Sequence, residues 1–564
     1  MPVKLKLYLA RKIIDSLKKK NPTFSALELK PLFSVSNNTE SSIQMEISLT
    51  KMENFFGISN ASEILRIEPD EIITKVTTVK DRANRKICFN INPNIFFKEV
   101  IDHGGAPDMH ADQKNVVVEF SSPNIAKPFH AGHLRSTIIG NFVSNLNAYM
   151  NNKVTRINYL GDWGTQFGLI KVGVKELNLS ENDIKQNPIQ LLYESYVHAN
   201  ALASKNDEIN KRAREEFLKL EKGSVEDVNS WQTYINFTIS ELKGIYDRLG
   251  VHFDEYNYES MYGAKQIKEV VDQMHKRKVV KVTHDGKTVA NIQDRSVTVM
   301  KSDGSTLYIT RDIAAAMDRF KKYEFHKMYY VVENGQNDHF NALKDILYQM
   351  DLPWAGRLKH VKFGRVRGMS TRKGNVVFLK DILDETKELM TQRQLNSPTT
   401  KVPITDTRTS DILGVSCVII NDLKQRRQKD YEFSWERALQ VQGDGGIKLQ
   451  YTHSRLCNLE KNSGGVAAKE CNPEYLKEPV IMDLVKEMGK FNDVISRSEE
   501  QLEACILVTY LFHLCNHINK ALKVLQVKNQ TPEIAAQRLL LFNTSRTILR
   551  QGMLILGLKP LTEM

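Results

Sequence analysis

The chain has 564 residues and a formal net charge of +12. This length exceeds what one hydrophobic core usually organises and suggests about three domains. Hydrophobic residues make up 41% of the chain and charged residues 26%, which excludes wholesale disorder and is typical of a globular protein. The positive charge favours a polyanionic partner such as nucleic acid, although mitochondrial matrix proteins are often basic for other reasons.

The cysteines argue against a metal or disulfide framework. The 6 cysteines include no Cys-x-x-Cys pair, which disfavours a zinc ribbon and favours a reducing compartment. His513 and His517 flank Cys515, but the surrounding leucines indicate a buried helix. The longest apolar stretch, residues 504–515, is shorter than the roughly 20 residues that cross a bilayer. We expect no metal site, no tightly bound cofactor and no membrane association.

The N-terminus has two interpretations. Residues 1–20 carry seven lysines and arginines against one acid, interleaved with leucine and isoleucine. This pattern fits a mitochondrial presequence, or equally the first amphipathic helix of a folded domain. We expect a protein of the mitochondrial matrix, with the cytoplasm as the alternative. Strand-like pieces such as residues 87–91, and a Gly-Pro breaker at 104–107, predict a separate N-terminal α+β domain over residues 1–108.

From residue 116 the pattern changes to short apolar segments that alternate with helical periodicity. The predicted strands are residues 116–120, 154–159, 328–332 and 360–363. This alternation predicts a doubly wound, Rossmann-like parallel sheet over residues 109–395. A charged, helix-prone segment at about residues 177–250 is too long for a crossover connection, so we expect a helical insertion there.

The last third of the chain is predicted to be helical. A polar stretch at residues 391–407 precedes segments with apolar residues at a spacing of about 3.6 residues. These segments are residues 411–423, 502–527 and 532–556. We therefore expect an all-α helical bundle over residues 396–564.

The motif His130-Ala131-Gly132-His133 directly follows a predicted buried strand and a polar turn. A strand, a turn and a helix in this order present a helix N-terminus to an anion. The two histidines share one face of the first helical turn, and Gly132 leaves room for a flat ring against the backbone. The motif predicts a phosphate site, although such a pair taken alone could be two surface residues.

Two further segments accompany this motif. Residues 368–375 form a glycine-bounded loop with two adjacent cations, and residues 158–168 form a turn rich in glycine and aromatic residues. In its extended form, residues 122–137, the first motif resembles the HIGH signature of class I aminoacyl-tRNA synthetases, and in particular of arginyl-tRNA synthetases. The loop at 368–375 resembles their KMSKS element, and residues 158–168 resemble a further signature of the arginyl enzymes.

The resemblance, which covers the chain from about residue 112 to its end, implies a function. A member of this family is an arginine–tRNA ligase, which makes arginyl-adenylate and pyrophosphate from L-arginine and Mg²⁺-ATP and then transfers arginine to the 3′ end of tRNA(Arg). The resemblance implies a monomer, an N-terminal domain over residues 1–108 that contacts tRNA, and a helical domain over residues 396–564 that binds the anticodon. A cysteinyl-type class I ligase should show zinc-binding cysteines near the pocket, and an inactive tRNA-binding paralogue should have lost the histidines of the motif.

The resemblance also implies an ATP site. The candidate ATP-binding residues are His130, Gly132, His133, Met369 and Ser370. The loop departs from the KMSKS pattern, because Thr371 stands where the second lysine would be. Lys127 is the expected substitute, with Arg372 and Lys373 as alternatives, because loop cations can neutralise the charge of departing pyrophosphate. The candidate catalytic residues are thus His130, His133, Lys127, Arg372 and Lys373.

The segment 307–316 is expected to be a short strand that runs into a helix. Taken alone, Thr310 suits an N-cap and Asp312 the first helical turn. In the family, the tyrosine and aspartate that match Tyr308 and Asp312 line the arginine pocket.

The chemistry of that pocket suits arginine. A guanidinium is planar and always charged, so carboxylates from Glu119 and Asp312 can bind it bidentately. Asn124 and Gln336 can address the amino and carboxylate ends of the amino acid. The candidate arginine-binding residues are Glu119, Ser122, Asn124, His133, Tyr308, Asp312 and Gln336.

Candidate tRNA contacts lie in the last third of the chain. Residues 422–429 are expected to form a basic helix, which is either a solvated face or a site for phosphates. Residues 449–456 resemble the anticodon-binding segment of the family, where bases stack on aromatic side chains, and residues 557–564 resemble its C-terminal end. The candidate tRNA-binding residues are Arg426, Arg427, Tyr451, Thr452 and Met564.

Overall fold

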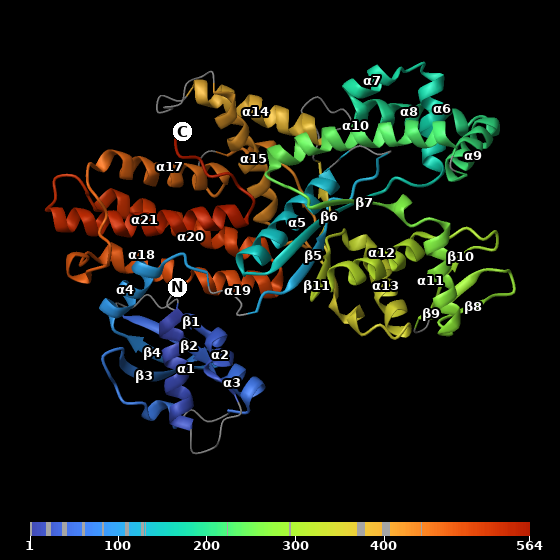
Figure 1. Cartoon of the computed structure of the whole chain (residues 1–564). Coiled ribbons are helices and arrows are strands. Elements are labelled where there is room, and N and C mark those ends of the chain that lie inside the picture. The colour runs from blue at the N-terminus through green and yellow to red at the C-terminus, as the bar shows by residue number, and fades with distance from the viewer. Residues whose placement is uncertain are drawn as a thin grey trace. The chain divides into compact units, whose positions relative to one another are not determined.

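The structure is a computed structural model. It describes residues 3–17, 24–36, 42–58, 62–81, 84–107, 112–125, 129, 131–222, 224–292, 295–368, 378–396, 406–440 and 443–564. The chain divides into two compact units (Figure 1). The central unit comprises Ala111–Arg393 and Ser410–Leu439, and the terminal unit comprises Met1–His110, Gln394–Thr409 and Gln440–Met564.

The central unit is built on a five-stranded parallel sheet with the strand order β12-β11-β5-β6-β7. Its strands are β5 (Asn115–Glu119), β6 (Lys153–Leu160), β7 (Glu255–Tyr258), β11 (Lys327–Tyr330) and β12 (Leu358–His360). Strands β6 and β7 extend the sheet on one side of β5, and β11 and β12 extend it on the other, which confirms the predicted doubly wound sheet. The valines of β5 are buried because helices cover both faces of such a sheet.

Helices surround this sheet. Those of the central unit outside the insertion are α5 (Ala131–Tyr149), α6 (Thr165–Glu176), α11 (Ala264–Lys276), α12 (Tyr308–Tyr323), α13 (Asn337–Gln349), α14 (Leu379–Leu395), α15 (Thr407–Leu423) and α16 (Trp435–Ala438). Short 3-10 turns are η4 (Glu259–Met261), η5 (Asn334–Gln336) and η6 (Pro353–Arg357). The minor strands are β8 (Val280–Val282), β9 (Thr288–Ile292), β10 (Arg295–Met300), β13 (Val366–Arg367) and β14 (Tyr431–Glu432).

The insertion predicted at residues 177–250 is helical. It contains α7 (Glu181–Gln186), α8 (Pro188–Ala203), α9 (Asp207–Glu221) and α10 (Val225–Leu249). Helices α8 and α9 pack closely on α6 because α6 carries glycines at the contacts. A Cβ on Gly168 would lie 1.8 Å from the Ala213 carbonyl oxygen, and one on Gly173 would lie 2.0 Å from the Ser195 carbonyl oxygen.

Three local predictions are wrong. Residues 307–316 contain no strand, because α12 begins at Tyr308 with Leu307 as its N-cap. Thr310 is not a cap, since it lies inside this helix and its hydroxyl donates to the Val299 carbonyl oxygen (2.6 Å). The basic run is not a helix either, because α15 ends at Leu423.

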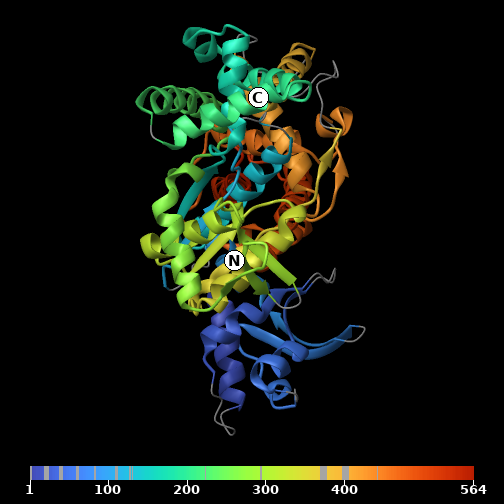
Figure 2. The ribbon, with the colours of Figure 1, turned by 90° about the vertical axis from the view of Figure 1, so that its right-hand side faces the viewer.

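The N-terminal part of the terminal unit combines helices with an antiparallel sheet of order β1-β2-β4-β3 (Figure 2). The strands are β1 (Phe33–Val35), β2 (Ile43–Ser48), β3 (Ile73–Asp81) and β4 (Asn84–Ile91). The helices are α1 (Val3–Leu17), α2 (Ala26–Leu29), η2 (Lys30–Leu32), α3 (Leu49–Phe56), η3 (Ile64–Arg66) and α4 (Pro93–His103). In β2 buried and half-buried residues alternate, as expected for a sheet with one face on a core.

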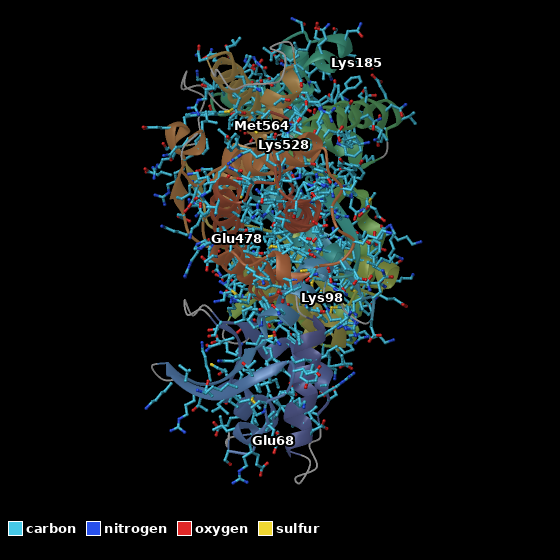
Figure 3. The ribbon with its side chains drawn as sticks, turned by 90° about the vertical axis from the view of Figure 1, so that its left-hand side faces the viewer. Glu68, Lys98, Lys185, Glu478, Lys528 and Met564 are labelled. Carbon is cyan, nitrogen blue, oxygen red and sulfur yellow. The ribbon has the colours of Figure 1, made fainter. Side chains whose placement is uncertain are left out.

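The C-terminal part of the terminal unit is the predicted helical bundle. It contains α17 (Gly446–Ser463), η7 (Pro473–Tyr475), α18 (Pro479–Gly489), α19 (Phe491–Gln501), α20 (Ala504–Val524) and α21 (Pro532–Ile555). Helix α4, which carries Lys98, packs against this bundle (Figure 3). The Thr544 hydroxyl on α21 donates to the Ile101 carbonyl oxygen (2.9 Å). No helix among the described residues is long and apolar enough to span a membrane.

Helix α1 is anchored at both ends of its buried face. Lys6 is buried and forms an ion pair with Asp493 of α19. Asp493 also accepts a hydrogen bond from the backbone N–H of Val35 (3.2 Å). Further along the helix, the Lys12 ammonium lies 2.8 Å from the Asp70 carboxylate. Residues 3–17 are therefore part of the folded unit, which favours the amphipathic-helix interpretation of this segment.

Candidate active site

The predicted arginine-site residues gather at the carboxyl edge of the central sheet. Glu119 ends β5, Ser122 and Asn124 lie in the loop that follows, and Gln336 lies in η5 after β11. Ser122 has a φ of 45°, so the chain turns sharply as it leaves β5. Asn124 forms an isolated bridge with Gly161, which joins the loops that follow β5 and β6. Ligands bind at this edge in open α/β sheets.

The phosphate side of the site is described in part. Helix α5 begins at Ala131 as the motif predicted, and Gly132 and His133 lie in its first turn. The His133 ring stacks on Phe129 with a centroid distance of 5.5 Å and an interplanar angle of 5°. His133 is half-buried, so its ring is oriented by packing at the helix N-terminus. The predicted residues that lie outside the described part of the chain are Lys127, His130, Met369, Ser370, Arg372 and Lys373.

Glu119 has a partner within the chain that sequence analysis did not find. Its carboxylate forms an ion pair with Arg319 of α12, and both side chains are buried. The Arg319 guanidinium also lies over the Tyr159 ring, 4.8 Å from its centroid. Burial alone would lower the pKa of Arg319, but Glu119 and neighbouring tyrosines raise it above its ordinary value. The charge of Glu119 is therefore balanced before any substrate binds.

Asp312 lies close enough to Glu119 for its charge to act on that carboxyl. One Asp312 oxygen, Oδ2, lies 2.6 Å from Nε2 of His339, in the first turn of α13. The Asp312 side chain keeps 25% of its surface exposed. Asp312 thus remains accessible to a substrate cation, and His339 fixes its orientation.

Glu259 is a further carboxyl of this site that sequence analysis missed. It begins η4, directly after β7, and its Oε2 atom is buried without a hydrogen-bond partner among the described residues. Burial, and next the charge of Asp312, raise the pKa of Glu259 to about 8. Glu259 lies in no recognisable motif, so only the chain fold, which returns β7 to the edge of the sheet, brings it here.

The turn that carries Glu259 is held by Asp162. This aspartate is fully buried and accepts hydrogen bonds from the backbone N–H (3.0 Å) and the hydroxyl (2.7 Å) of Ser260. Burial raises the pKa of Asp162 to about 6 even though these hydrogen bonds oppose the shift. The turn at residues 158–168 thus has a structural role, because it fixes the position of η4.

The remaining predicted arginine-site residues are more open. Tyr308 has 60% of its surface exposed, and Gln336 is also exposed. The backbone N–H of Ser122 donates to the Asn158 side-chain oxygen (3.1 Å), which ties this loop to β6. The predicted residues that end or follow β5 and β11 thus lie at one edge of the sheet, and they range from the buried Glu119 to the exposed Gln336.

Arg135, two residues after His133, forms a second buried cluster. Its side chain is 1% exposed and lies 3.3 Å from the Asp422 carboxylate and 5.1 Å from the centroid of the Tyr431 ring. Its guanidinium donates to the carbonyl oxygens of Gly364 and Lys429. This cluster ties helix α5 to the residues that precede β13 and β14.

The candidate tRNA residues of the central unit differ in their surroundings. The Arg427 guanidinium donates to the Lys362 carbonyl oxygen, and its own carbonyl oxygen accepts the N–H of Gly364 (3.0 Å). These bonds hold residues 424–429 as a turn in place of the expected helix. Arg426 is exposed, so it is the better placed of the two for a phosphate.

In the terminal unit, the two motifs that resemble the family's tRNA-binding segments lie together. The C-terminal tail runs along α17, where Gln450 bonds to residues 559 and 561 and His453 Nδ1 lies 2.8 Å from the Leu561 carbonyl oxygen. Met564 ends this tail (Figure 3). Tyr451 has 50% of its surface exposed, whereas Thr452 is fully buried and its hydroxyl accepts from Asn519 (3.0 Å). Thr452 thus has no surface for tRNA in this structure.

Within the described ranges, no group of three or more His, Cys, Asp or Glu side chains is arranged to hold a metal ion. The 6 cysteines are all free thiols.

Comparison with known proteins defines the class. Residues 98–435 match the family model of the class I (R) tRNA synthetase catalytic domain, and residues 449–564 match the DALR anticodon binding domain. The fold is therefore that of a class I tRNA synthetase. An arginyl-tRNA synthetase structure from Plasmodium falciparum superposes with a TM-score of 0.78 at 24% identity, covering 100% of this chain and 98% of that one.

Sequence relatives narrow the class. A Bos taurus protein named probable mitochondrial arginine–tRNA ligase is 39% identical over 510 residues, which cover 88% of each chain. The cytoplasmic arginine–tRNA ligase of Saccharomyces cerevisiae is 40% identical over 504 residues, covering 85% of this chain and 82% of that protein. The chain belongs to the arginyl-tRNA synthetases, the class I enzymes that ligate arginine to tRNA.

Proposed function

We propose that the chain binds its arginine substrate between Asp312 and Glu259 at the carboxyl edge of the central sheet. The observation that carries this assignment is the buried Oε2 atom of Glu259, which no donor among the described residues reaches, and the charge of Asp312 acts on this carboxyl. Glu119 has a structural role beside this pocket, because its charge is already neutralised by Arg319. A guanidinium brings planar, permanently charged donors that suit two carboxylates.

The rest of the substrate extends toward helix α5. Asn124 and Gln336, at the ends of β5 and β11, hold the amino and carboxylate ends of arginine. The substrate carboxylate then attacks the α-phosphate of ATP, pyrophosphate leaves, and arginyl-adenylate forms. His133 faces the triphosphate from the N-terminus of α5, where backbone N–H groups also favour anions. Catalysis is mainly positioning and charge stabilisation, so the chain needs no general base for this step.

ATP enters this site as a complex with Mg²⁺, which neutralises charge on the phosphates. We assign the pyrophosphate contacts to Lys127 and His130, with Arg372 and Lys373 as the alternatives for Lys127. In the second step, the terminal adenosine of tRNA(Arg) attacks the adenylate through a ribose hydroxyl. The arginyl group moves to the tRNA and AMP leaves.

We assign the tRNA contacts to the terminal unit and to the exposed Arg426 of the central unit. Tyr451 on α17 offers an exposed ring to an unstacked base, and Arg455 lies 5.6 Å from its centroid. Met564 and the tail beside α17 extend the same surface. The N-terminal domain over residues 1–108 contributes further contacts to the phosphate backbone of the tRNA, in keeping with the net charge of +12.

We assign the chain to the mitochondrial matrix as a monomer. The N-terminal segment is rich in lysine and arginine, which is compatible with import, and one of the two relatives described above is named mitochondrial, the other cytoplasmic. Because α1 is anchored by Lys6 and Lys12, we expect it to remain in the mature protein. Sequencing the N-terminus of protein from isolated mitochondria tests whether the chain is in the matrix and whether α1 remains in the mature protein. The mass of the protein in solution tests whether it is a monomer.

Arginine-dependent exchange of pyrophosphate into ATP, measured with and without tRNA(Arg), tests the proposed function. Exchange that requires arginine and does not occur with cysteine supports it. Absence of exchange with arginine in the presence of tRNA(Arg) contradicts it. Transfer of labelled arginine to tRNA reports the second step separately.

Replacing Asp312 with asparagine raises the KM for arginine by about 10–100-fold, because a hydrogen bond to a charged group contributes about 1.5–3 kcal/mol. The KM for ATP changes little, since the shape of the pocket is retained. Asp318→Asn, on the exposed side of the same helix, is the matched control and leaves the KM for arginine unchanged. Equal KM values for Asp312→Asn and the wild type would contradict the assignment of Asp312.

A further inference from the structure

The Glu259 carboxyl lies where a negative charge is poorly stabilised. Glu259 is half-buried, and Asp162 holds its neighbour Ser260 through two hydrogen bonds, so the backbone at this turn is fixed. The Oε2 atom is buried and has no donor among the described residues. A carboxylate in such a place lacks the hydrogen bonds that stabilise its charge.

Three charged groups act on Glu259, and they come from two parts of the central unit. Asp312 and Arg311 lie on α12, with opposite effects, and Asp162 follows β6. Burial is the largest cause and the charges of the two carboxyls add to it, so the neutral acid is favoured and the pKa of Glu259 rises to about 8. His339 acts on Glu259 only indirectly, because it contacts Asp312.

We propose that Glu259 carries a proton in the arginine-free enzyme and releases it to solvent when the guanidinium of arginine binds. This inference rests on the proposed role of Asp312 and Glu259 as the arginine-binding carboxyls. The O–H bond of the acid breaks, the proton passes to the buffer, and the carboxylate that remains pairs with the guanidinium. The substrate keeps its own proton, because a guanidinium stays charged in proteins.

Because the guanidinium replaces the proton of Glu259, the net charge of the pocket is the same with and without arginine. Without arginine, two adjacent carboxylates would repel each other, and the proton on Glu259 removes that repulsion. With arginine bound, one cation meets two anions. A neutral isostere such as citrulline supplies no charge to replace the proton, so Glu259 remains protonated beside it.

Calorimetric titration of the full chain with L-arginine, in buffers of different ionisation enthalpy, tests the proposal. At pH 7 the observed heat should vary with the buffer and indicate release of close to one proton per arginine. Arginine affinity should rise with pH between about 6 and 8, by at most tenfold per pH unit, and level off above 8. A heat independent of the buffer at pH 7 would overturn the proposal without any variant being made.

Two variants locate the proton. Glu259→Gln should abolish the release and flatten the pH dependence, whereas Glu269→Gln, an exposed glutamate on α11, should behave as the wild type. If Glu259→Gln weakens arginine binding but still releases a proton, the group is another one, such as His339, and the proposal is wrong while the pocket stands. If Asp312→Asn and Glu259→Gln both leave arginine affinity unchanged, the proposed pocket itself is wrong.

Discussion

Replacing Arg319 with methionine lowers the free energy of unfolding of the central unit by about 3–5 kcal/mol at pH 7, the usual cost of removing one partner from a buried ion pair. The reason is that Glu119 then remains buried without a counter-ion. The pKa of Glu119 in the folded variant rises above its unfolded value, so the loss is smallest at low pH and grows as the pH rises. Urea unfolding at pH 5 and pH 8 measures both effects.

The double variant Arg319→Met with Glu119→Gln separates charge from packing. With both charges removed, the pair is replaced by neutral groups of similar size, and most of the lost stability returns. Because the chain has two units, the transition of the central unit is followed separately, by hydrogen exchange of the β5 and β6 amides. A double variant as unstable as the single one would show that Arg319 acts by packing alone.

Replacing Lys6 with methionine has a comparable effect on the terminal unit, about 3–5 kcal/mol, because Asp493 loses the cation that opposes its burial. Burial already raises the pKa of Asp493 above its ordinary value even with Lys6 present. Hydrogen exchange of the α19 amides, which lie in the same unit, reports the loss.

The same helix supplies the control. Lys12 keeps 35% of its side chain exposed in its pair with Asp70, so Lys12→Met should cost less than about 1 kcal/mol. Removal of residues 1–17 should destabilise the terminal unit at least as much as Lys6→Met. If the truncated chain is as stable as the full chain, α1 is not needed for the fold, and the presequence interpretation is favoured instead.

Most of the fold follows from periodicity. The apolar run at Val116–Val118 and the alternation that follows it predicted the parallel sheet, and the 3.6-residue pattern predicted α15, α20 and α21 nearly to their ends. Predictions failed where a tertiary contact outweighs local preference. Thr310 looked like a cap, but its hydroxyl bonds to a carbonyl of β10, and the run after Leu423 is bent by the contacts of Arg427.

The site residues also divide into those that the motifs predicted and those that only the structure shows. Motifs located the loop after β5, the start of α5 and the first turns of α12. They did not show that Glu119 is paired within the chain, because its partner Arg319 is 200 residues away and lies in no motif. Glu259 was missed for the same reason, and Thr452 was chosen for its neighbour Tyr451, although helix periodicity turns it inward.

The discontinuous terminal unit bears on the order in which the chain folds during synthesis. Lys6 and its partner Asp493 are 487 residues apart, and Ile101 binds Thr544 on the last helix. The N-terminal segment therefore leaves the ribosome long before the bundle that covers it exists, whereas the central unit is complete once residue 439 has emerged. The nascent chain thus presents the face of α4 that packs on the bundle to chaperones for most of translation, and Lys6 is among the first residues made and the last to reach its partner.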